Sequence, residues 1–482
     1  MDTLLNRFSS SVKGIISGFD RIVFKGMLRP IMFAAGMQGF LISRNILNKD
    51  FKTHAIAQSQ VIVANAETLS KKETGQPITY LPSSNERKET IARNRQKELG
   101  TRKGLIEVWS CVEACWTYRS AFNPEANYPI LKQEQTRCKH LYFYFDDPVY
   151  GFMSVRLQTW APYEIQIALN GREWLRRSLD SAGHEYIING NKFLHIDDYE
   201  LAQKYLDTQL TADFETILKS FLPTVFPVMN EVVPGMSYYW TLWQSELAKD
   251  YIFQDPKTVQ SLMNDFLRHA LATGCGERVL HYFGAPVKAN GQPHPNSNPE
   301  IISRSKIWYD GLRIRHWNGK NSLKMYNEHN VLRYEMTMND PSKYKIYRHA
   351  ENQDTSEPKK LMNIRKGIAD ITARANVSFQ AISRFTEHMA SVKESASLEK
   401  LLASTSNPIK NDGKRQRALD VFGKDLPFLR AIADPFFDVQ YITNKELQNK
   451  LKSSAWAKNM TGKQLSGKIS RHLFLLRKHG IY

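Results

Sequence analysis

Alternating apolar and polar residues predict several β-strands in this chain. The clearest signal runs from Cys138 to Leu169, where KHLYFYFDD, FMSVRLQTW and YEIQIALN are separated by the turn-forming stretches DPVYG and AP. If the apolar residues share one face of a sheet, the opposite face carries polar side chains. These are His140, Tyr142, Tyr144, Asp146, Arg156, Gln158, Glu164 and Gln166. Similar patterns predict strands at DRIVFKGML, GLRIRHW, NSLKMY and VLRYEMTMN.

Other segments have the spacing of helices. The charged run at 85–104 predicts a solvated surface helix that ends at Gly100, and NGREWLRRSLDSAG predicts a helix that leaves the three-stranded sheet. Residues 200–275 are predicted to be mostly helical, including SYYWTLWQSELAKDYIF, whose aromatic residues would fill a core. On that helix Glu246 and Asp250 would lie on a solvated edge.

Two polar stretches are candidate boundaries between domains. They are GAPVKANGQPHPNSNPE at 284–300 and NQDTSEPKK at 352–360. We therefore predict an α+β, multidomain protein with antiparallel sheets, surrounding helices and a C-terminal helix-turn-helix. The predicted domains are an N-terminal α+β region (1–135), an antiparallel sheet with a helical region (136–283), a region containing a β-hairpin (301–350), a helical linker region (361–410) and the helix-turn-helix domain (415–482).

Composition and charge add a class of partner to this picture. The 482 residues are 42% hydrophobic and 24% charged, as in a globular protein, and 66 Lys and Arg exceed 48 Asp and Glu by 18. Such an excess favours nucleic acid through counterion release, with DNA expected before RNA. No membrane partner is expected, because neither end contains a Lys-rich amphipathic helix. Without a signal peptide or a spanning segment, the expected location is the cytoplasm.

The cysteines predict no disulfide framework. Cys111, Cys115, Cys138 and Cys275 are too few for a chain of this length, and no zinc-finger spacing of Cys and His follows them. We interpret them as buried, reduced thiols.

The C-terminal segment has the features of a DNA-binding domain. Residues 441–482 contain nine Lys or Arg and one acidic residue, and Thr443 and Thr461 are candidate N-caps for successive helices. Along the last helix, Leu465, Ile469, Leu473 and Leu476 form an apolar stripe. The remaining positions predict contacts with nucleic acid through Lys463, Lys468, Ser470, Arg471, Phe474, Arg477 and Lys478. The end is winged-helix-like with the wing absent, and the alternative is a solvated helical bundle.

A predicted hairpin at NSLKMYNEHNVLRYEMTMND (321–340) has a candidate site on one face. Alternation places Lys324 and Tyr326 opposite Glu335 and Arg333, with a four-residue turn from Asn327 to Asn330 between the strands. A carboxylate in this setting is suited to a hard cation for phosphodiester chemistry. Cross-strand charge pairing on a solvated face is the alternative. Arg313 and Arg315, on the strand before the hairpin, are further candidates for binding nucleic acid.

Other acidic residues are candidate ligands for Mg²⁺ or Mn²⁺. Asp146 and Glu164 belong to the polar face of the first three strands, and Asp20, Glu246 and Asp250 lie elsewhere in the chain. Two or three carboxylates brought together would bind such an ion. We assign Tyr326, Glu335, Asp146 and Glu164 as candidate catalytic residues, with Glu335 and Asp146 as metal ligands. For Asp146 and Asp147 the alternative is turn chemistry at DDPVYG.

Two resemblances to known proteins follow from these motifs. The pattern S-x-x-K-x-Y-N-E followed by L-R-Y-E resembles an element of plasmid rolling-circle replication initiators, which implies Tyr326 as nucleophile and Glu335 as metal ligand. Glu328 stands where that element has Lys, and His140 is followed by Leu141 and Tyr142 rather than by a second His, so the metal site of that family is not carried over. Over nearly its full length, with SGFDRIVFKGMLRP, WAPYEIQIALNGREWL and YYWTLWQSE, the chain resembles an uncharacterised group of bacterial hypothetical proteins.

These observations lead to three functional hypotheses. The first is a nucleic-acid-binding protein of a bacterial mobile or replicative element with a metal-dependent nicking or strand-transfer site, in the manner of an endonuclease or transposase. The second is a non-catalytic DNA- or RNA-binding protein, such as a regulator or a ribonucleoprotein component. The third is a metabolic enzyme with an acidic substrate. Nucleotide-binding signatures and the motifs GxSxG and HExxH are absent from the sequence.

Overall fold

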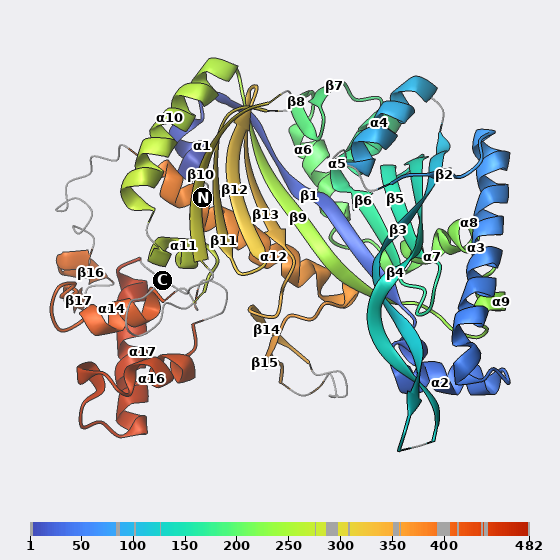
Figure 1. Ribbon diagram of the computed structural model, residues 1–482. Helices are drawn as coiled ribbons and strands as arrows, with labels where there is room; N and C mark the ends of the chain where they lie inside the picture. The colour runs from blue at the N-terminus through green and yellow to red at the C-terminus, as the bar shows by residue number, and fades with distance from the viewer. Residues whose placement is uncertain are drawn as a thin grey trace.

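An eleven-stranded sheet forms the centre of this α+β protein, in which many helices surround the strands (Figure 1). The computed structural model describes residues 3–82, 87–100, 103–125, 127–274, 276–285, 297–306, 309–349, 356, 358–392, 405–411, 414–434, 437 and 442–480. In spatial order the strands are β10 (Ser297–Lys306), β11 (Tyr309–Asn318), β12 (Asn321–Glu328), β13 (Val331–Met338), β9 (Tyr239–Phe253), β1 (Val12–Met27), β6 (Ile165–Asn170), β5 (Gly151–Gln158), β4 (Tyr128–Asp147), β3 (Gly104–Asn123) and β2 (Thr79–Tyr80). Neighbouring strands are antiparallel except β2 and β3.

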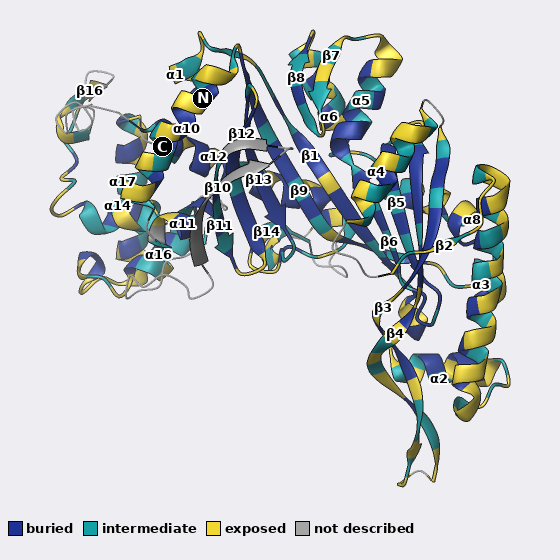
Figure 2. Cartoon of the chain, turned by 45° about the horizontal axis from the view of Figure 1, so that its top comes forward, coloured by how far each residue is buried: buried dark blue, intermediate teal, exposed yellow. Residues whose placement is uncertain are grey.

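One face of the sheet is apolar and is covered by long helices. Alternate residues such as Phe143, Leu247 and Met336 point to this face and belong to the main hydrophobic core. Helices α3 (Phe51–Thr74), α10 (Pro256–Thr273) and α12 (Ile371–Ala390) contact the sheet strands. Smaller helices complete the surroundings of the core: α1 (Thr3–Phe8), α2 (Ala34–Ser43), α7 (Phe214–Ser220), α8 (Leu222–Val225), α9 (Met229–Val232) and α11 (Gly276–Tyr282). In Figure 2 the central strands are buried over most of their length, whereas α3 has a continuous exposed side.

The opposite face of the sheet is polar and only partly covered. Helices α5 (Gly171–Ala182) and α6 (Tyr199–Thr208) lie with the hairpin β7 (Tyr186–Asn189) and β8 (Lys192–Ile196) over one end of β1, β9 and β13. Their apolar side chains form a separate cluster with Ile16, Ile252 and Val331 of the strands beneath. Helix α4 (Lys88–Leu99) packs through Ala92 on β3 and β4. The polar face therefore has a closed end and a more open middle.

The structure confirms most of the predicted strands and several helix boundaries. The three strands within 138–170, the strand at DRIVFKGML and the hairpin strands are present, and β1 begins earlier than predicted. Helix α4 is followed by Gly100, while Asn170 caps α5 and Gly183 follows it in the left-handed conformation that favours glycine. Strands from 1–135, 136–283 and 301–350 all enter the same sheet. Most of 352–360, most of 284–300 and Cys275 lie outside the described residues.

One prediction was wrong over a long stretch. SYYWTLWQSELAKDYIF contains β9 rather than a helix, so Glu246 and Asp250 lie on a strand. Both edges of β9 pair with neighbours, β1 on one side and β13 on the other. This pairing satisfies the backbone and buries residues on both faces, which overrides the helical preference of Glu, Leu, Ala and Lys. The predicted hairpin turn was also too long, because β12 continues to Glu328 and only His329 and Asn330 form the turn.

The last helices have a hydrophobic cluster of their own. Helices α14 (Leu426–Ile432), α16 (Asn444–Leu451) and α17 (Gly462–Lys478) pack around Phe428, Trp456 and Ile469. Thr443 and Thr461 cap α16 and α17 as predicted, and the reciprocal capping box is between Thr461 and Gln464. Short two-stranded sheets, β14 (Lys345–Arg348) with β15 (Lys360–Asn363) and β16 (Ile409–Asn411) with β17 (Lys414–Gln416), precede them. In the part of the chain described, no helix is long and apolar enough to cross a membrane.

Candidate functional site on the polar sheet face

The polar face of β1, β9, β12 and β13 brings charged residues from distant parts of the sequence together. Lys324 pairs with Glu335 and Tyr326 pairs with Arg333 in the hairpin, as the alternation predicted. Arg333 in turn lies opposite Asp250 of β9. The register between β1 and β9 shifts between Phe19 and Arg21, so Asp20 is an extra residue in a β-bulge.

Arg333 is the centre of a buried ion network at the closed end. Its Nε and Nη2 donate to the two carboxylate oxygens of Asp250 at 2.6 and 2.7 Å, and its Nη1 donates to Oδ1 of Asp20 at 3.1 Å. Arg172 of α5 adds a second cation, 3.2 Å from Asp250. Burial raises the pKa of Asp20, but Arg333 and Arg172 outweigh this and hold the pKa below its usual value. The network therefore holds Asp20 ionised.

Glu335 lies beside this network and is itself enclosed. Nζ of Lys324 contacts its carboxylate, and the hydroxyl of Tyr326 donates to Oε2 at 3.4 Å. Burial raises the pKa of Tyr326 well above its usual value, and Glu335 contributes to that rise while Arg333 opposes it. A buried phenol of this kind is a poor source of phenolate, so the geometry disfavours the implied role of Tyr326 as nucleophile.

Glu246 differs from the other acidic residues because it faces open space. It is partly exposed, and none of the described residues forms an ion pair with it. Burial, followed by the nearby Glu335, raises its pKa to about 7, while Lys324 and Arg21 oppose the shift. A carboxyl group with a shifted pKa in a cavity is a candidate for function.

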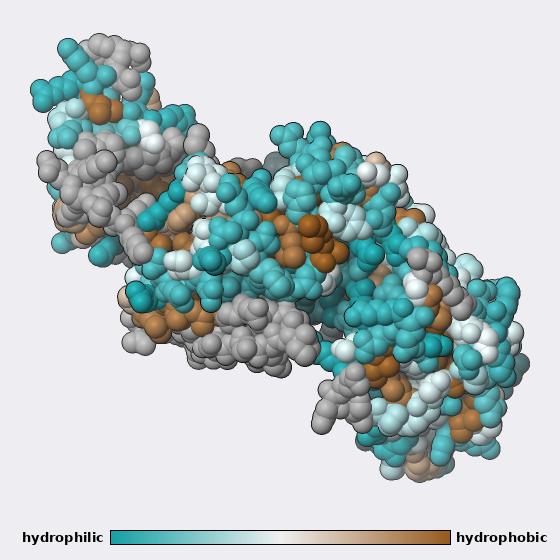
Figure 3. All heavy atoms as spheres, turned by 90° about the horizontal axis from the view of Figure 1, so that it is seen from above, coloured by the Kyte–Doolittle hydropathy of each residue, from teal (hydrophilic) through white to brown (hydrophobic). Residues whose placement is uncertain are grey.

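The cavity in front of Glu246 has a volume of about 590 Å³. Asp20 and Glu246 contribute carboxylates to its wall, and Arg21, Arg87 and Lys88 contribute cations. The remaining lining residues are Glu89, Tyr142, Tyr144, Phe152, Met153, Ser154, Ala168, Leu169, Asn170 and Asn191. Seen from above, the middle of the molecule is mostly hydrophilic (Figure 3). The cavity has the two kinds of charge that a cation and a phosphate group require.

The structure does not bring all predicted catalytic residues together. Asp146 contacts Nη2 of Arg177 and lies 3.8 Å from Lys103, and Glu164 contacts Lys25. Strands β9, β1, β6 and β5 separate β4 from β13, which amounts to roughly 24 Å between Asp146 and Glu335 at about 4.8 Å per strand. The two residues therefore cannot share one metal ion. Asp147 has the alternative role at the turn, since its Oδ1 accepts from the backbone N–H groups of Val149 and Tyr150.

The predicted nucleic-acid-binding residues of α17 divide into two groups. Lys463, Arg471, Phe474 and Arg477 are exposed. Lys468 instead donates to the backbone carbonyl of Trp456 at 2.8 Å, and Oγ of Ser470 accepts from Asn444 of α16 at 2.9 Å. Lys478 is partly buried, with Nζ above the ring of Phe474. On β11, Nη2 of Arg315 donates to Ser322, and Arg313 lies opposite Tyr326.

Some residues of the site were not predicted from the sequence. Arg172 was assigned only to a helix, and Asn191, whose backbone carbonyl accepts from Arg333 at 2.7 Å, lies in the turn between β7 and β8. No local motif identifies them, because their role depends on α5 and the β7–β8 hairpin folding back over the sheet. Cys115, Cys138 and His140 also lie together, and among the described residues they are a group of three whose side chains are placed to hold a metal. Comparison with protein-family models, curated proteins and solved structures found no match to this chain.

Proposed function

We propose that this chain is a nucleic-acid-binding protein that cleaves or transfers phosphodiester bonds with a divalent metal ion at the cavity of Asp20 and Glu246. The observation that carries the proposal is this cavity, whose wall contains the carboxylates of Asp20 and Glu246 together with Arg21, Arg87 and Lys88. Carboxylates suit Mg²⁺ or Mn²⁺, which usually binds one or two of them together with water and substrate phosphate. The adjacent cations suit the phosphate itself.

Each residue at this site has a distinct proposed role. The carboxylates of Asp20 and Glu246 would hold the ion, which would stabilise negative charge developing on the phosphate. Asp20 is ionised because of Arg333, whereas Glu246 must lose its proton before it becomes a ligand. The nearby Glu335 raises the pKa of Glu246, and Lys324, which pairs with Glu335, partly offsets that effect. Arg21 and Arg87 would orient the nucleic-acid backbone.

The same proposal assigns DNA docking to the C-terminal part of the chain. We place duplex docking on a separate C-terminal helix-turn-helix domain, in which α17 would enter the major groove through Lys463, Arg471, Phe474 and Arg477. The net charge of +18 supports a polyanionic partner, DNA before RNA. The rolling-circle resemblance favours a role in a bacterial mobile or replicative element, and we place that role in the cytoplasm.

Nicking of supercoiled plasmid by the full chain tests the catalytic part of the proposal. We expect nicked product with Mg²⁺ or Mn²⁺ and none with chelator. Glu246→Gln should lower the rate by about 10²-fold or more, because the amide is a much weaker metal ligand and carries no charge. Glu98→Gln is the matched control, since Glu98 is exposed on α4, where it pairs with Arg95. Equal rates for the two variants would contradict the assignment of the cavity.

Binding measured at several salt concentrations tests the docking part separately. Replacing both Lys463 and Arg471 by Ala should reduce the slope of log K against log salt by about 1.8, if each residue contacts one phosphate of duplex DNA. Replacing both Lys71 and Lys72 by Ala, at exposed positions of α3, removes the same two charges and is the control. Binding that depends on α17 but produces no cleavage under any metal condition would favour the second hypothesis, a non-catalytic binder.

A further inference from the structure

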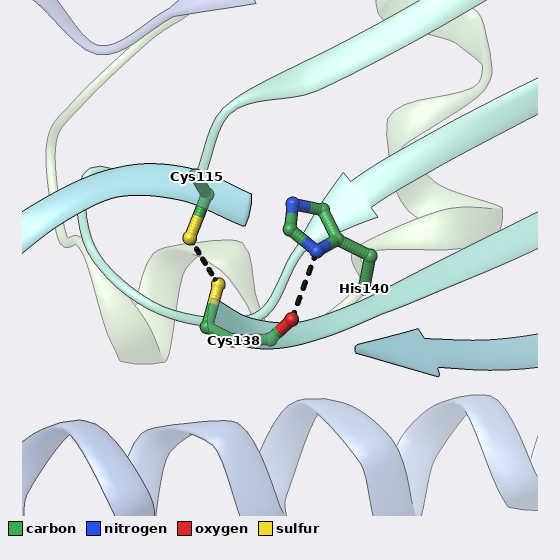
Figure 4. A group of neighbouring side chains, drawn as sticks. All are labelled: Cys115, Cys138 and His140. Carbon is green, nitrogen blue, oxygen red and sulfur yellow. Dashed lines mark hydrogen bonds between the residues drawn. The ribbon is translucent and has the colours of Figure 1, made fainter. Parts of the chain in front are cut away.

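Two cysteines and a histidine meet on the polar face of the sheet, away from the cavity of Asp20 and Glu246. Cys115 lies on β3, and Cys138 and His140 lie on β4 (Figure 4). In the β3–β4 register Cys138 is opposite Glu113 and His140 is opposite Cys111, so Cys115 is the diagonal neighbour of Cys138. All three side chains are buried, and one ligand atom from each lies within 4.8 Å of the others. The strands themselves hold the three residues together.

The orientation of His140 leaves one ring nitrogen available as a ligand. Nδ1 lies 3.1 Å from the backbone carbonyl oxygen of Cys138, so this nitrogen is the one that carries the proton and donates it. Nε2 is fully buried and has no hydrogen-bond partner among the residues that the structure describes. Figure 4 shows that the ring edge with Nε2 faces the two sulfur atoms. An imidazole fixed through Nδ1 to a backbone carbonyl, with Nε2 free, is the arrangement of metal-binding histidines.

The ionisation of the group also suits a metal ligand. Burial lowers the pKa of His140 to about 4, so the ring is neutral and Nε2 keeps its lone pair at neutral pH. The two Sγ atoms are 2.6 Å apart and share a hydrogen bond, which lowers the pKa of Cys115 and raises that of Cys138. A bound cation would displace the protons of both thiols.

We propose that Cys115, Cys138 and His140 form a Zn²⁺ site that joins β3 to β4. Two thiolates and a neutral imidazole are ligands for zinc rather than for Mg²⁺ or Mn²⁺, which prefer oxygen. Two thiolates also balance the two charges of the ion, so a neutral complex is buried. Tetrahedral zinc with Zn–S bonds of about 2.3 Å holds its sulfur atoms about 3.8 Å apart, so one cysteine must rotate outward when the ion binds. The fourth position is left for water.

The location of this site gives it a structural consequence. Beyond Cys115 and Cys138, β3 and β4 continue as a ribbon that extends away from the rest of the sheet (Figure 1). A zinc ion with ligands on both strands fixes their pairing where the ribbon begins. Binding of zinc should therefore protect the ribbon against proteolysis and raise the melting temperature of the whole chain.

Metal content of the purified full chain tests the site directly. We expect one zinc per chain by elemental analysis, and at least ~100-fold weaker zinc binding for Cys115→Ser and for His140→Gln, since loss of even an outer partner of a metal ligand costs 10–100-fold. Cys111→Ser is the matched control. Cys111 is buried on the same face of β3, opposite His140, but lies outside the group. Its variant should keep the full zinc content.

Cobalt provides a measurement that does not depend on a folded variant. Co²⁺ added to the metal-free full chain should give sulfur-to-cobalt charge-transfer absorption together with the visible bands of a tetrahedral ion. Zinc should displace the cobalt, whereas Mg²⁺ should not. Absence of these bands overturns the proposal, as does zinc retained by Cys115→Ser. Free thiols are also counted after denaturation. A Cys115–Cys138 disulfide in the purified chain would likewise overturn the proposal.

Discussion

Asp250 and Glu246 lie on the same face of the same strand, yet their surroundings are opposite. Asp250 is fully buried and receives a two-point contact from Arg333 and a further cation from Arg172. Glu246 is partly exposed, lines the cavity and has its pKa raised to about 7 by burial and by Glu335. The two residues are four positions apart on β9, or roughly 13 Å. Over that distance the role of the carboxylate changes from structural at Asp250 to available for chemistry at Glu246.

The difference arises from the elements that cover the sheet. At the closed end, α5 supplies Arg172, and the turn after β7 supplies the Asn191 carbonyl that accepts from Arg333. Glu246 lies beyond that cover, beside the bulge at Asp20. Cations from a neighbouring strand and from a covering helix therefore commit Asp250 to structure, and the sequence of β9 alone does not decide this. The following experiments test that contrast.

The largest effect is expected at the closed end. Arg333→Ala removes the partner of two buried aspartates and should lower the free energy of unfolding by about 3–5 kcal/mol, because the remaining charges stay in the interior. Urea denaturation followed by circular dichroism measures it. Arg119→Ala, which breaks the exposed pair with Glu134, should cost at most about 1 kcal/mol. Similar losses for the two variants would show that the Arg333 network is not a structural unit.

At Glu246, in the more open part of the polar face, the contribution to the free energy of unfolding should fall as the pH rises. Glu246 has a folded-state pKa of about 7 against an ordinary 4.5, so the folded state binds its proton more tightly than the unfolded state. Between pH 4.5 and 7 this proton is lost from the unfolded chain first, and the contribution of Glu246 decreases by up to about 3 kcal/mol. Glu246→Gln should remove this decrease. Metal-dependent nicking by the wild-type chain should increase through the same range as Glu246 ionises.

Urea denaturation of wild-type and Glu246→Gln chains at pH 5 and pH 7.5 measures the difference. Other groups titrate in both proteins and cancel in the comparison. Glu98→Gln, at an exposed position, should leave the pH dependence unchanged. If the wild-type and Glu246→Gln chains lose the same stability between pH 5 and pH 7.5, Glu246 is not the group that loses its proton. The contrast between Glu246 and Asp250 would then be wrong.

The sequence predicted the sheet better than the site. Alternation was sufficient for β4, β5, β6 and the hairpin, including the pairing of Lys324 with Glu335, because one face of each strand is apolar. It failed for β9, which pairs on both edges and buries residues on both faces, so its pattern has no clear period. The surroundings of Asp250 and Glu246 depend on α5 and on the bulge at Asp20, and both are distant from these residues in the sequence.

The same limit explains the group of Cys115, Cys138 and His140. His140 and Cys138 are two residues apart and therefore share a face, which alternation indicates. Cys115 joins them only through the register of β3 with β4, across strands of 20 residues each. A search for zinc-finger spacing cannot find a site whose ligands are neighbours across a sheet. A register prediction for the β3–β4 ribbon would have been needed.

A smaller effect separates the two possible roles of Tyr326, which lies opposite Arg333 in the hairpin. Tyr326→Phe removes a buried hydroxyl that donates to Glu335 and should cost about 1 kcal/mol of stability. Nicking should stay within a few-fold of wild type, because a buried phenol with a raised pKa is not the attacking group. The two measurements together are decisive. Loss of nicking with little loss of stability would restore the nucleophile role that the replication-initiator resemblance implies.

The smallest predicted effect concerns Arg21, a cation beside Glu246. Arg21 lies opposite Glu246 in the β1–β9 register and holds the pKa of that carboxyl group down, against burial and Glu335. Arg21→Gln should therefore raise the pKa of Glu246 further, but by less than about 1 unit, since Arg21 is nearly half exposed and also pairs with Glu89 at 3.8 Å. The stability of Arg21→Gln is compared with that of the double variant Arg21→Gln, Glu246→Gln over a range of pH. The pH at the midpoint of the difference reports the pKa of Glu246, and Lys72→Gln is the control for the lost charge. A shift much larger than 1 unit would mean that water does not screen Arg21, and that the open end of the strand is as enclosed as the end around Asp250.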